Sequence, residues 1–308
     1  MARWQGPALM VASAATWAAG LIFTKLTLDV TAARPTSVLL VQLVASVVVL
    51  ALAGLLSGAD LSQGWRKGWV GLLEPGIAYQ LALAGLALTS AANASVLGSL
   101  EPVMVPILAW LLLRERPHPR LIIVILGATV GSVLVSYTTS GSGGSWHGDA
   151  LIVASVAAAA LYVVVASKQV ADVKPLPAAL SQQTWALGLI ILVLGGQIAF
   201  TGGPFWPEPN ATGFLLAGFS GVLNYALPFW LYLSALTRMP VSRAATYLTL
   251  IPVFGVLLSV VVLREKLTWL DVLGGVLVVV ALFVDATLAA RADRKAAVKA
   301  EAAGTMVR

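Results

Sequence analysis

Long apolar runs make up most of the chain, and each run is about as long as a membrane-crossing helix. About 20 apolar residues cross the ~30 Å of hydrocarbon in a bilayer, because a helix rises about 1.5 Å per residue. The pattern therefore predicts an all-α polytopic membrane protein with ten transmembrane helices. The ten runs lie at residues 7–28, 36–56, 69–88, 93–113, 120–137, 149–169, 178–200, 212–236, 242–263 and 269–290.

The two halves of the chain resemble each other. A shift of 142 residues aligns Gly6-Pro-Ala-Leu-Met-Val-Ala-Ser13 with Gly148-Asp-Ala-Leu-Ile-Val-Ala-Ser155, and six of the eight positions are identical. A shift of 150 residues pairs Leu113-Arg-Glu115 with Leu263-Arg-Glu265. Because each half holds five spans, an odd number, the second half enters the membrane inverted. We therefore expect a first five-helix repeat at 1–139, a Gly/Ser-rich connector at 140–148, a second, inverted repeat at 149–290 and a charged cytoplasmic tail at 291–308.

Positive charge gathers on one side of the predicted membrane. The N-terminus, the loops after the even-numbered spans and the tail together hold 15 of the 19 Lys and Arg residues. Cytoplasmic loops carry such an excess, so both termini are predicted to be cytoplasmic, in a bacterial inner membrane. The residues left on the opposite side are Lys25, Arg34, Arg264 and Lys266.

Composition supports burial in a bilayer and narrows the chemistry. The chain is 59% hydrophobic and 10% charged, with a mean hydropathy of +0.92, whereas soluble domains carry about 25% charged residues. It has no cysteine, and its two histidines, His118 and His147, lie in predicted loops. We therefore expect no enzyme, no metal centre and no cofactor. The +6 net charge is a topology signal between apolar spans rather than a sign of a nucleic-acid partner.

The two repeats, with their endings Leu111-Leu-Leu-Arg-Glu115 and Val261-Val-Leu-Arg-Glu265, resemble the ten-helix EamA-type branch of the drug/metabolite transporter superfamily. Both endings carry arginine where glycine is common in that branch. The resemblance covers residues 7–290 and implies a transporter. The length, the tryptophan content and the Ser99-Leu-Glu-Pro102 stretch are most similar to bacterial amino-acid exporters, including the aromatic type.

Glu101 places a carboxyl group inside the predicted fourth span, about 12 Å from its start. A carboxylate at the bilayer centre costs at least about 2.5 kcal/mol, so it faces a cavity or a partner. We expect Glu101 and Ser99 to line a substrate cavity. The alternative is a structural glutamate bonded to Ser99, Asn93 or a neighbouring helix. Proline removes a helix hydrogen bond; the predicted hinge prolines are Pro75, Pro102 and Pro252.

Glu74 and Asn224 are paired by the 150-residue shift. Polar groups at equivalent positions of inverted repeats flank the axis between them, where transporters bind substrate. The predicted depths disagree, because Glu74 lies much closer to the start of its span than Asn224 does to the start of its own, so one span boundary is misplaced. The alternative is an interfacial Glu74, with Asn224 bonding two helices together.

Aromatic side chains are interspersed among these groups. Tyr79 follows Glu74 by five residues and is expected on roughly the same helix face. Trp17, Tyr162 and Tyr225 also fall inside spans. Such rings can stack on an aromatic substrate or attract an ammonium group, so we expect them at the cavity; the alternative is packing against lipid.

These features predict a secondary transporter that exports amino acids, aromatic ones among them, or related metabolites by alternating access around a midplane cavity. No G-x-x-x-x-G-K-[ST] motif is present, so the sequence offers no site for ATP. The alternative is an efflux carrier for hydrophobic cations, drugs or sugars. The expected partners are a small-molecule substrate and the lipid bilayer; the oligomeric state, the coupling ion and the exact substrate stay open.

Overall fold

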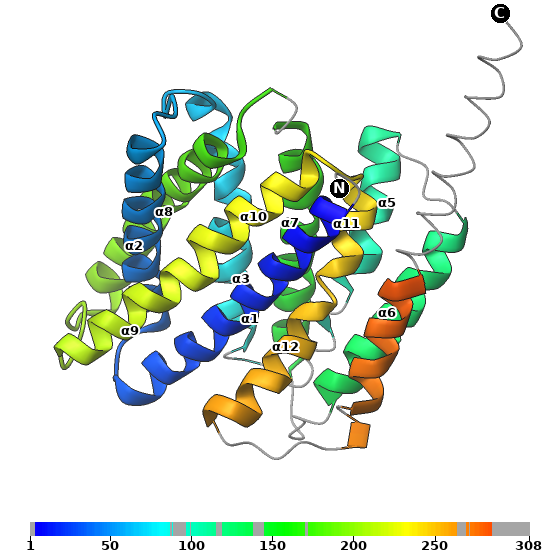
Figure 1. Ribbon diagram of the computed structural model, residues 1–308. Coiled ribbons are helices and arrows are strands. Elements are labelled where there is room, and N and C mark those ends of the chain that lie inside the picture. Colours follow the sequence, from blue (N-terminus) through cyan, green and yellow to red (C-terminus); the bar gives the residue numbers. More distant parts are fainter. Residues whose placement is uncertain are drawn as a thin grey trace, which may run out of the picture.

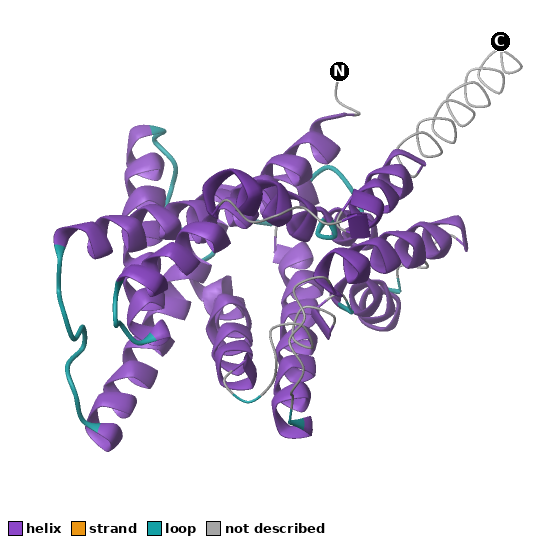
Figure 2. Ribbon diagram, turned by 90° about the horizontal axis from the view of Figure 1, so that it is seen from below, coloured by secondary structure: helices purple, strands orange, loops and turns teal. Residues whose placement is uncertain are grey.

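The computed structural model describes residues 4–86, 88, 97–98, 100–114, 119–137, 145–169, 172–263, 269–270 and 272–284. Helices account for nearly all of these residues, short loops join them, and no strand occurs among them (Figures 1 and 2). The predicted all-α fold is confirmed.

The first half of the chain contains two long helices, a broken third span and two further helices. They are α1 (Gln5–Val30), α2 (Pro35–Leu56), η2 (Trp65–Leu72), η3 (Leu73–Ile77), α3 (Ala78–Leu86), α5 (Glu101–Leu113) and α6 (Pro119–Tyr137). Each of the five spans expected in this half coincides with helix in its described part.

The second half repeats this order. Its elements are α7 (Trp146–Gln169), α8 (Pro175–Thr201), α9 (Ala211–Gly221), η4 (Val222–Ala226), α10 (Leu227–Leu236), α11 (Val241–Tyr247), α12 (Leu250–Leu258), η5 (Ser259–Leu263) and the apolar helix Val272–Val284. Because α7 begins at Trp146, the last three residues of the predicted connector are helical.

Six helical segments in the described part of the chain are long and apolar enough to cross a membrane, and three shorter apolar helices accompany them. Large apolar side chains face outward on them, such as Leu192, which is 74% exposed, and Phe200, which is 92% exposed. Water would not accommodate so much exposed apolar surface, whereas hydrocarbon does. The chain is a multi-pass membrane protein.

Helices of one half pack mainly against helices of the other. Contacts join α8 with η2 and, reciprocally, α2 with α9. In the same way α1 packs on α10 and α12, while α7 packs on α3 and α5. Figure 1 shows α1 running alongside α10, and α2 beside α8 and α9. Each contact thus has a counterpart with the two halves exchanged, as an inverted repeat requires.

Two glycines make this reciprocal packing possible. A Cβ atom at Gly71 would lie 1.9 Å from the carbonyl oxygen of Gln182 on α8, and one at Gly221 would lie 2.4 Å from the carbonyl oxygen of Gln42 on α2. These distances are far below van der Waals contact, so the helix backbones cross at positions where only hydrogen fits. Gly71 and Gly221 are related by the 150-residue shift.

The helix of the third span begins at Trp65, four residues before the predicted start of the span at residue 69. Arg66 and Lys67 lower the mean hydropathy of this first turn, so hydropathy alone does not include it in the span. A 3₁₀ helix such as η2 rises about 2.0 Å per residue, so Glu74 lies about 18 Å from that start. Asn224 lies about 20 Å from Ala211 along its own span. The two depths now agree, which removes the mismatch found in the sequence.

Candidate functional site

Glu74 lies at a break in the third span. Its backbone is extended (φ −145°, ψ 129°), although the residues around it are helical, and a cis peptide bond joins it to Pro75. The side chain is buried, with only 6% of its surface exposed. Since the helix is interrupted here, the expectation that Glu74 and Tyr79 share one face of a continuous helix is wrong.

Aromatic rings from five elements gather in this region. Trp17 of α1 donates a hydrogen bond from Nε1 to the hydroxyl of Tyr79 of α3 at 3.0 Å. The rings of Tyr79 and Tyr225 have centroids 5.4 Å apart, and those of Trp17 and Phe229 lie 5.0 Å apart. Tyr162 of α7 joins the group through Phe229, at 5.7 Å. We call Trp17, Tyr79, Tyr162, Tyr225, Phe229 and Tyr232 the aromatic cluster.

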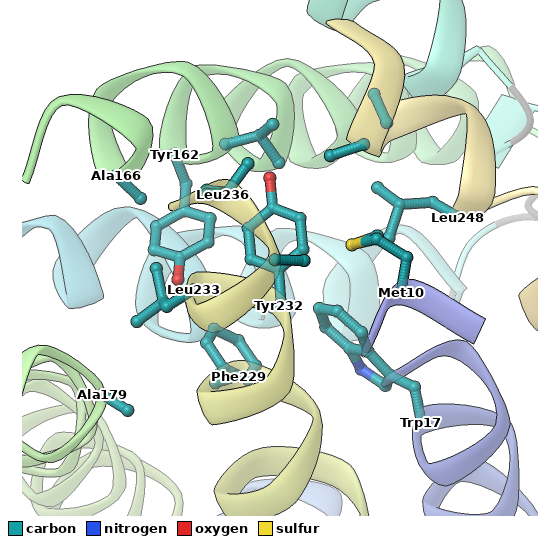
Figure 3. Packing of buried hydrophobic residues seen from close by; sticks show 14 of the residues in the cluster. Met10, Trp17, Tyr162, Ala166, Ala179, Phe229, Tyr232, Leu233, Leu236 and Leu248 are labelled. Atoms are coloured by element: carbon teal, nitrogen blue, oxygen red, sulfur yellow. The ribbon is translucent and has the colours of Figure 1, made fainter. Parts of the chain in front are cut away.

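Two members of the aromatic cluster were missed as site residues in the sequence, Phe229 and Tyr232. Figure 3 shows them on α10, in one group with Tyr162 of α7 and Trp17 of α1. Phe229 is the repeat counterpart of Tyr79, so the 150-residue shift could have identified it. Nothing in the sequence separates Tyr232 from the other aromatic residues of the spans.

Polar contacts within the site are sparse. The hydroxyl of Tyr162 donates to Oε1 of Gln182 at 2.8 Å. Within the part of the chain that the structure describes, neither the hydroxyl of Tyr232 nor Oδ1 of Asn224 has a hydrogen-bond partner. Both residues are only 1% exposed. Buried polar atoms are normally bonded, so these two atoms are suited to meet a ligand or ordered water.

A second carboxyl group joins the site from the start of α5. Glu101 is half-buried, and it lies near enough to Glu74 for the two charges to interact. It also lies within electrostatic range of Tyr79 and Tyr232. Glu74, Glu101 and tyrosines of the aromatic cluster therefore lie within electrostatic range of one another.

The remaining predicted site residues fall in different places. Asn224 lies in η4, next to Tyr225, where a Cβ atom on Gly20 of α1 would be 2.5 Å from the Asn224 Cβ. Ser99 lies outside the described residues. Pro102 lies in the first turn of α5 and Pro252 in the first turn of α12; their hinge role stays a prediction.

The site has the chemistry of a binding site for an organic ammonium ion. Carboxylates pair with ammonium groups, and aromatic faces attract them through their quadrupoles. No group of three or more His, Cys, Asp or Glu residues that could hold a metal ion occurs in the described chain.

Comparison with known proteins agrees with this architecture. The EamA-like transporter family matches the chain twice, over residues 4–137 and 146–285, one match per half. A curated relative, "Uncharacterized transporter YetK" of Bacillus subtilis, is 27% identical over 207 residues, 66% of this chain and 62% of the relative. An "Uncharacterized transporter" of Archaeoglobus fulgidus is 31% identical over 199 residues, 63% of this chain and 67% of the relative. The match to the Bacillus protein therefore spans less than two thirds of that protein's length.

The fold also occurs among solved structures. One crystal structure superposes with a TM-score of 0.78 at 19% identity, and the match covers 93% of this chain and 98% of the other. That likeness concerns the fold alone. With both halves matched by one family of transporters and the ten-helix repeat architecture in place, the chain belongs to the EamA-like transporter family.

Proposed function

We propose that the protein is a secondary transporter that exports small metabolites carrying an amino group, amino acids and aromatic ones among them. It acts by alternating access, and the substrate binds between the two halves at mid-depth. The bilayer and a small-molecule substrate are its partners, and we assign it no catalytic step.

One observation carries the proposal. Glu74 is a buried carboxyl group at a break in a membrane-spanning helix, and it has a second carboxyl group within electrostatic range. Tyr79, Tyr162 and Tyr225 of the aromatic cluster also lie within its electrostatic range. A buried ionisable group inside a membrane span is costly, and such groups serve substrate or ion pathways. Broken helices at the interface of inverted repeats form substrate sites in other transporters.

The packing supports a carrier that rocks between two states. Because the main contacts between the halves have counterparts with the halves exchanged, an inward-open and an outward-open form can have similar free energies. The excess of basic residues on one side supports cytoplasmic termini and a bacterial inner-membrane location.

The test is uptake by liposomes that contain the purified protein. Labelled amino acids and sugars are supplied separately, with and without a pH gradient. We expect accumulation of amino-bearing compounds and at least about a tenfold loss in Glu74→Gln, a change of about 1.4 kcal/mol. Glu208→Gln is the matched control, because this carboxyl group lies exposed in the loop before α9.

Two results would count against the proposal. Uptake of sugars with no uptake of any amino-bearing compound would exclude the substrate class. Normal transport by Glu74→Gln would show that the Glu74 carboxyl group is not needed for transport.

A further inference from the structure

We infer that the site selects cations over zwitterions, so that an aromatic amine, amide or ester binds more tightly than the amino acid from which it derives. This inference rests on the proposed function and narrows its substrate class. It follows from the distribution of charge over the whole molecule.

No basic residue stands near the two carboxyl groups along the chain. Lys, Arg and His are absent from residues 68–113, the stretch that carries Glu74 and Glu101. They are also absent from residues 175–237, which hold Tyr225, Phe229 and Tyr232, and from 244–263. A carboxylate on the substrate would therefore find no cationic partner in these segments.

Helices α1 and α7 add only one basic group at membrane depth. In α7, residues 148–167 contain no Lys, Arg or His. In α1, Lys25 comes eight residues after Trp17, about 12 Å further along the helix. It is the one basic residue of α1, and it lies about two turns beyond Trp17 towards the end of that helix.

The other polar groups of the site carry no positive charge. Oδ1 of Asn224 is a buried acceptor, and the Tyr232 hydroxyl can donate or accept; neither has a partner in the described chain. The hydroxyl of Tyr162 already donates to Gln182, and the Trp17 indole N–H already donates to Tyr79. In an amino acid, the α-carboxylate lies two bonds from the ammonium nitrogen, so an ammonium group held at Glu74 would bring that carboxylate against like charge.

The aromatic faces act in the same direction. A ring presents negative potential on its face, which attracts an ammonium ion and repels a carboxylate. Five members of the aromatic cluster, all except the half-buried Tyr79, are at most 7% exposed, so little solvent screens these interactions.

Affinity tests the inference more cleanly than uptake, because neutral forms of simple amines cross lipid unaided. The detergent-solubilised full chain is titrated calorimetrically with phenylalanine, phenethylamine, phenylalaninamide and the permanently charged N,N,N-trimethylphenethylammonium. We expect each of the three cations to bind at least about tenfold more tightly than phenylalanine, a difference of about 1.4 kcal/mol.

Glu101→Gln removes one negative charge from the site and should reduce this preference at least about threefold, while phenethylamine still binds through Glu74. Glu208→Gln should leave the preference unchanged. A circular-dichroism melt of each variant shows whether it is folded.

The outcomes separate the inference from the function on which it rests. Phenylalanine that binds as tightly as phenethylamine, or a folded Glu101→Gln protein with the wild-type preference, overturns the inference and leaves the proposed function intact. Failure of all four compounds to bind, together with no liposome uptake of amino-bearing compounds, overturns both.

Discussion

The Trp17 indole is fixed at the site by a single hydrogen bond. Its ring is 7% exposed, and Nε1 donates to the Tyr79 hydroxyl at 3.0 Å, which links α1 to α3. A buried indole N–H needs an acceptor, since in an apolar environment nothing else compensates for its lost hydration. The orientation of Trp17 therefore depends on Tyr79.

Tyr79→Phe should reduce the free energy of unfolding by about 1–3 kcal/mol, because it leaves the Trp17 N–H buried without an acceptor. Removing both partners of a buried hydrogen bond destabilises a protein less than leaving one partner unpaired. The double variant Trp17→Phe with Tyr79→Phe should therefore lose less free energy of unfolding than the two single variants lose together. Thermal unfolding in detergent measures all three. Additive effects would show that the bond contributes nothing.

At the residue scale the sequence predicts candidate site residues wherever their chemistry contrasts with that of their surroundings. Glu74 and Glu101 stand out because a carboxyl group inside an apolar run is expensive. Phe229 and Tyr232 do not stand out, because an aromatic residue in a span can equally face lipid. Their direction depends on η4, whose wider π-helical turn changes the register of α10 relative to α9.

At the element scale, the third and eighth spans change their winding at equivalent places. The break in η3 and the π-helical segment η4 follow directly after the close crossings at Gly71 and Gly221. Hydropathy located both spans because it counts apolar residues. It could not report the extended residue Glu74 or the π turn of η4, which alter length and register but not composition.

Gly71→Ala and Gly221→Ala should each destabilise the protein by about 2–3 kcal/mol or prevent folding, because the added methyl group meets a carbonyl oxygen of the facing helix. Gly195→Ala in α8 is the matched control, since a Cβ there has no atom within 4 Å. Alanine favours helix over glycine, so this control should be neutral or slightly stabilised. Unfolding midpoints in detergent give the comparison. Wild-type stability in Gly71→Ala would mean that the helices separate freely at the crossing.

At the scale of the whole molecule, each half depends on the other for its packing. Contacts at the ends of the spans also join one half to the other. Arg34, before α2, donates to Thr201 and Gly202 at the end of α8, and Lys67 in η2 pairs with Asp172 before α8. The repeats and the number of spans could be predicted because similar segments recur along the chain and each span is an apolar run. The interlocked arrangement could not, since two similar halves can also pack as separate bundles.

Cytoplasmic termini can be checked by single-cysteine labelling, and the chain offers a clean background because it contains no cysteine. Gln63→Cys lies exposed in the loop between α2 and η2, and Glu208→Cys lies exposed in the loop between α8 and α9. Lysine and arginine are retained on the cytoplasmic side, so a membrane-impermeant maleimide should label Glu208→Cys in intact cells and Gln63→Cys only after permeabilisation. The cysteine-free parent controls for background, and labelling of denatured protein controls for expression. The opposite pattern would invert the whole molecule in the membrane; labelling of both sites in intact cells would mean that these loops do not lie on opposite sides.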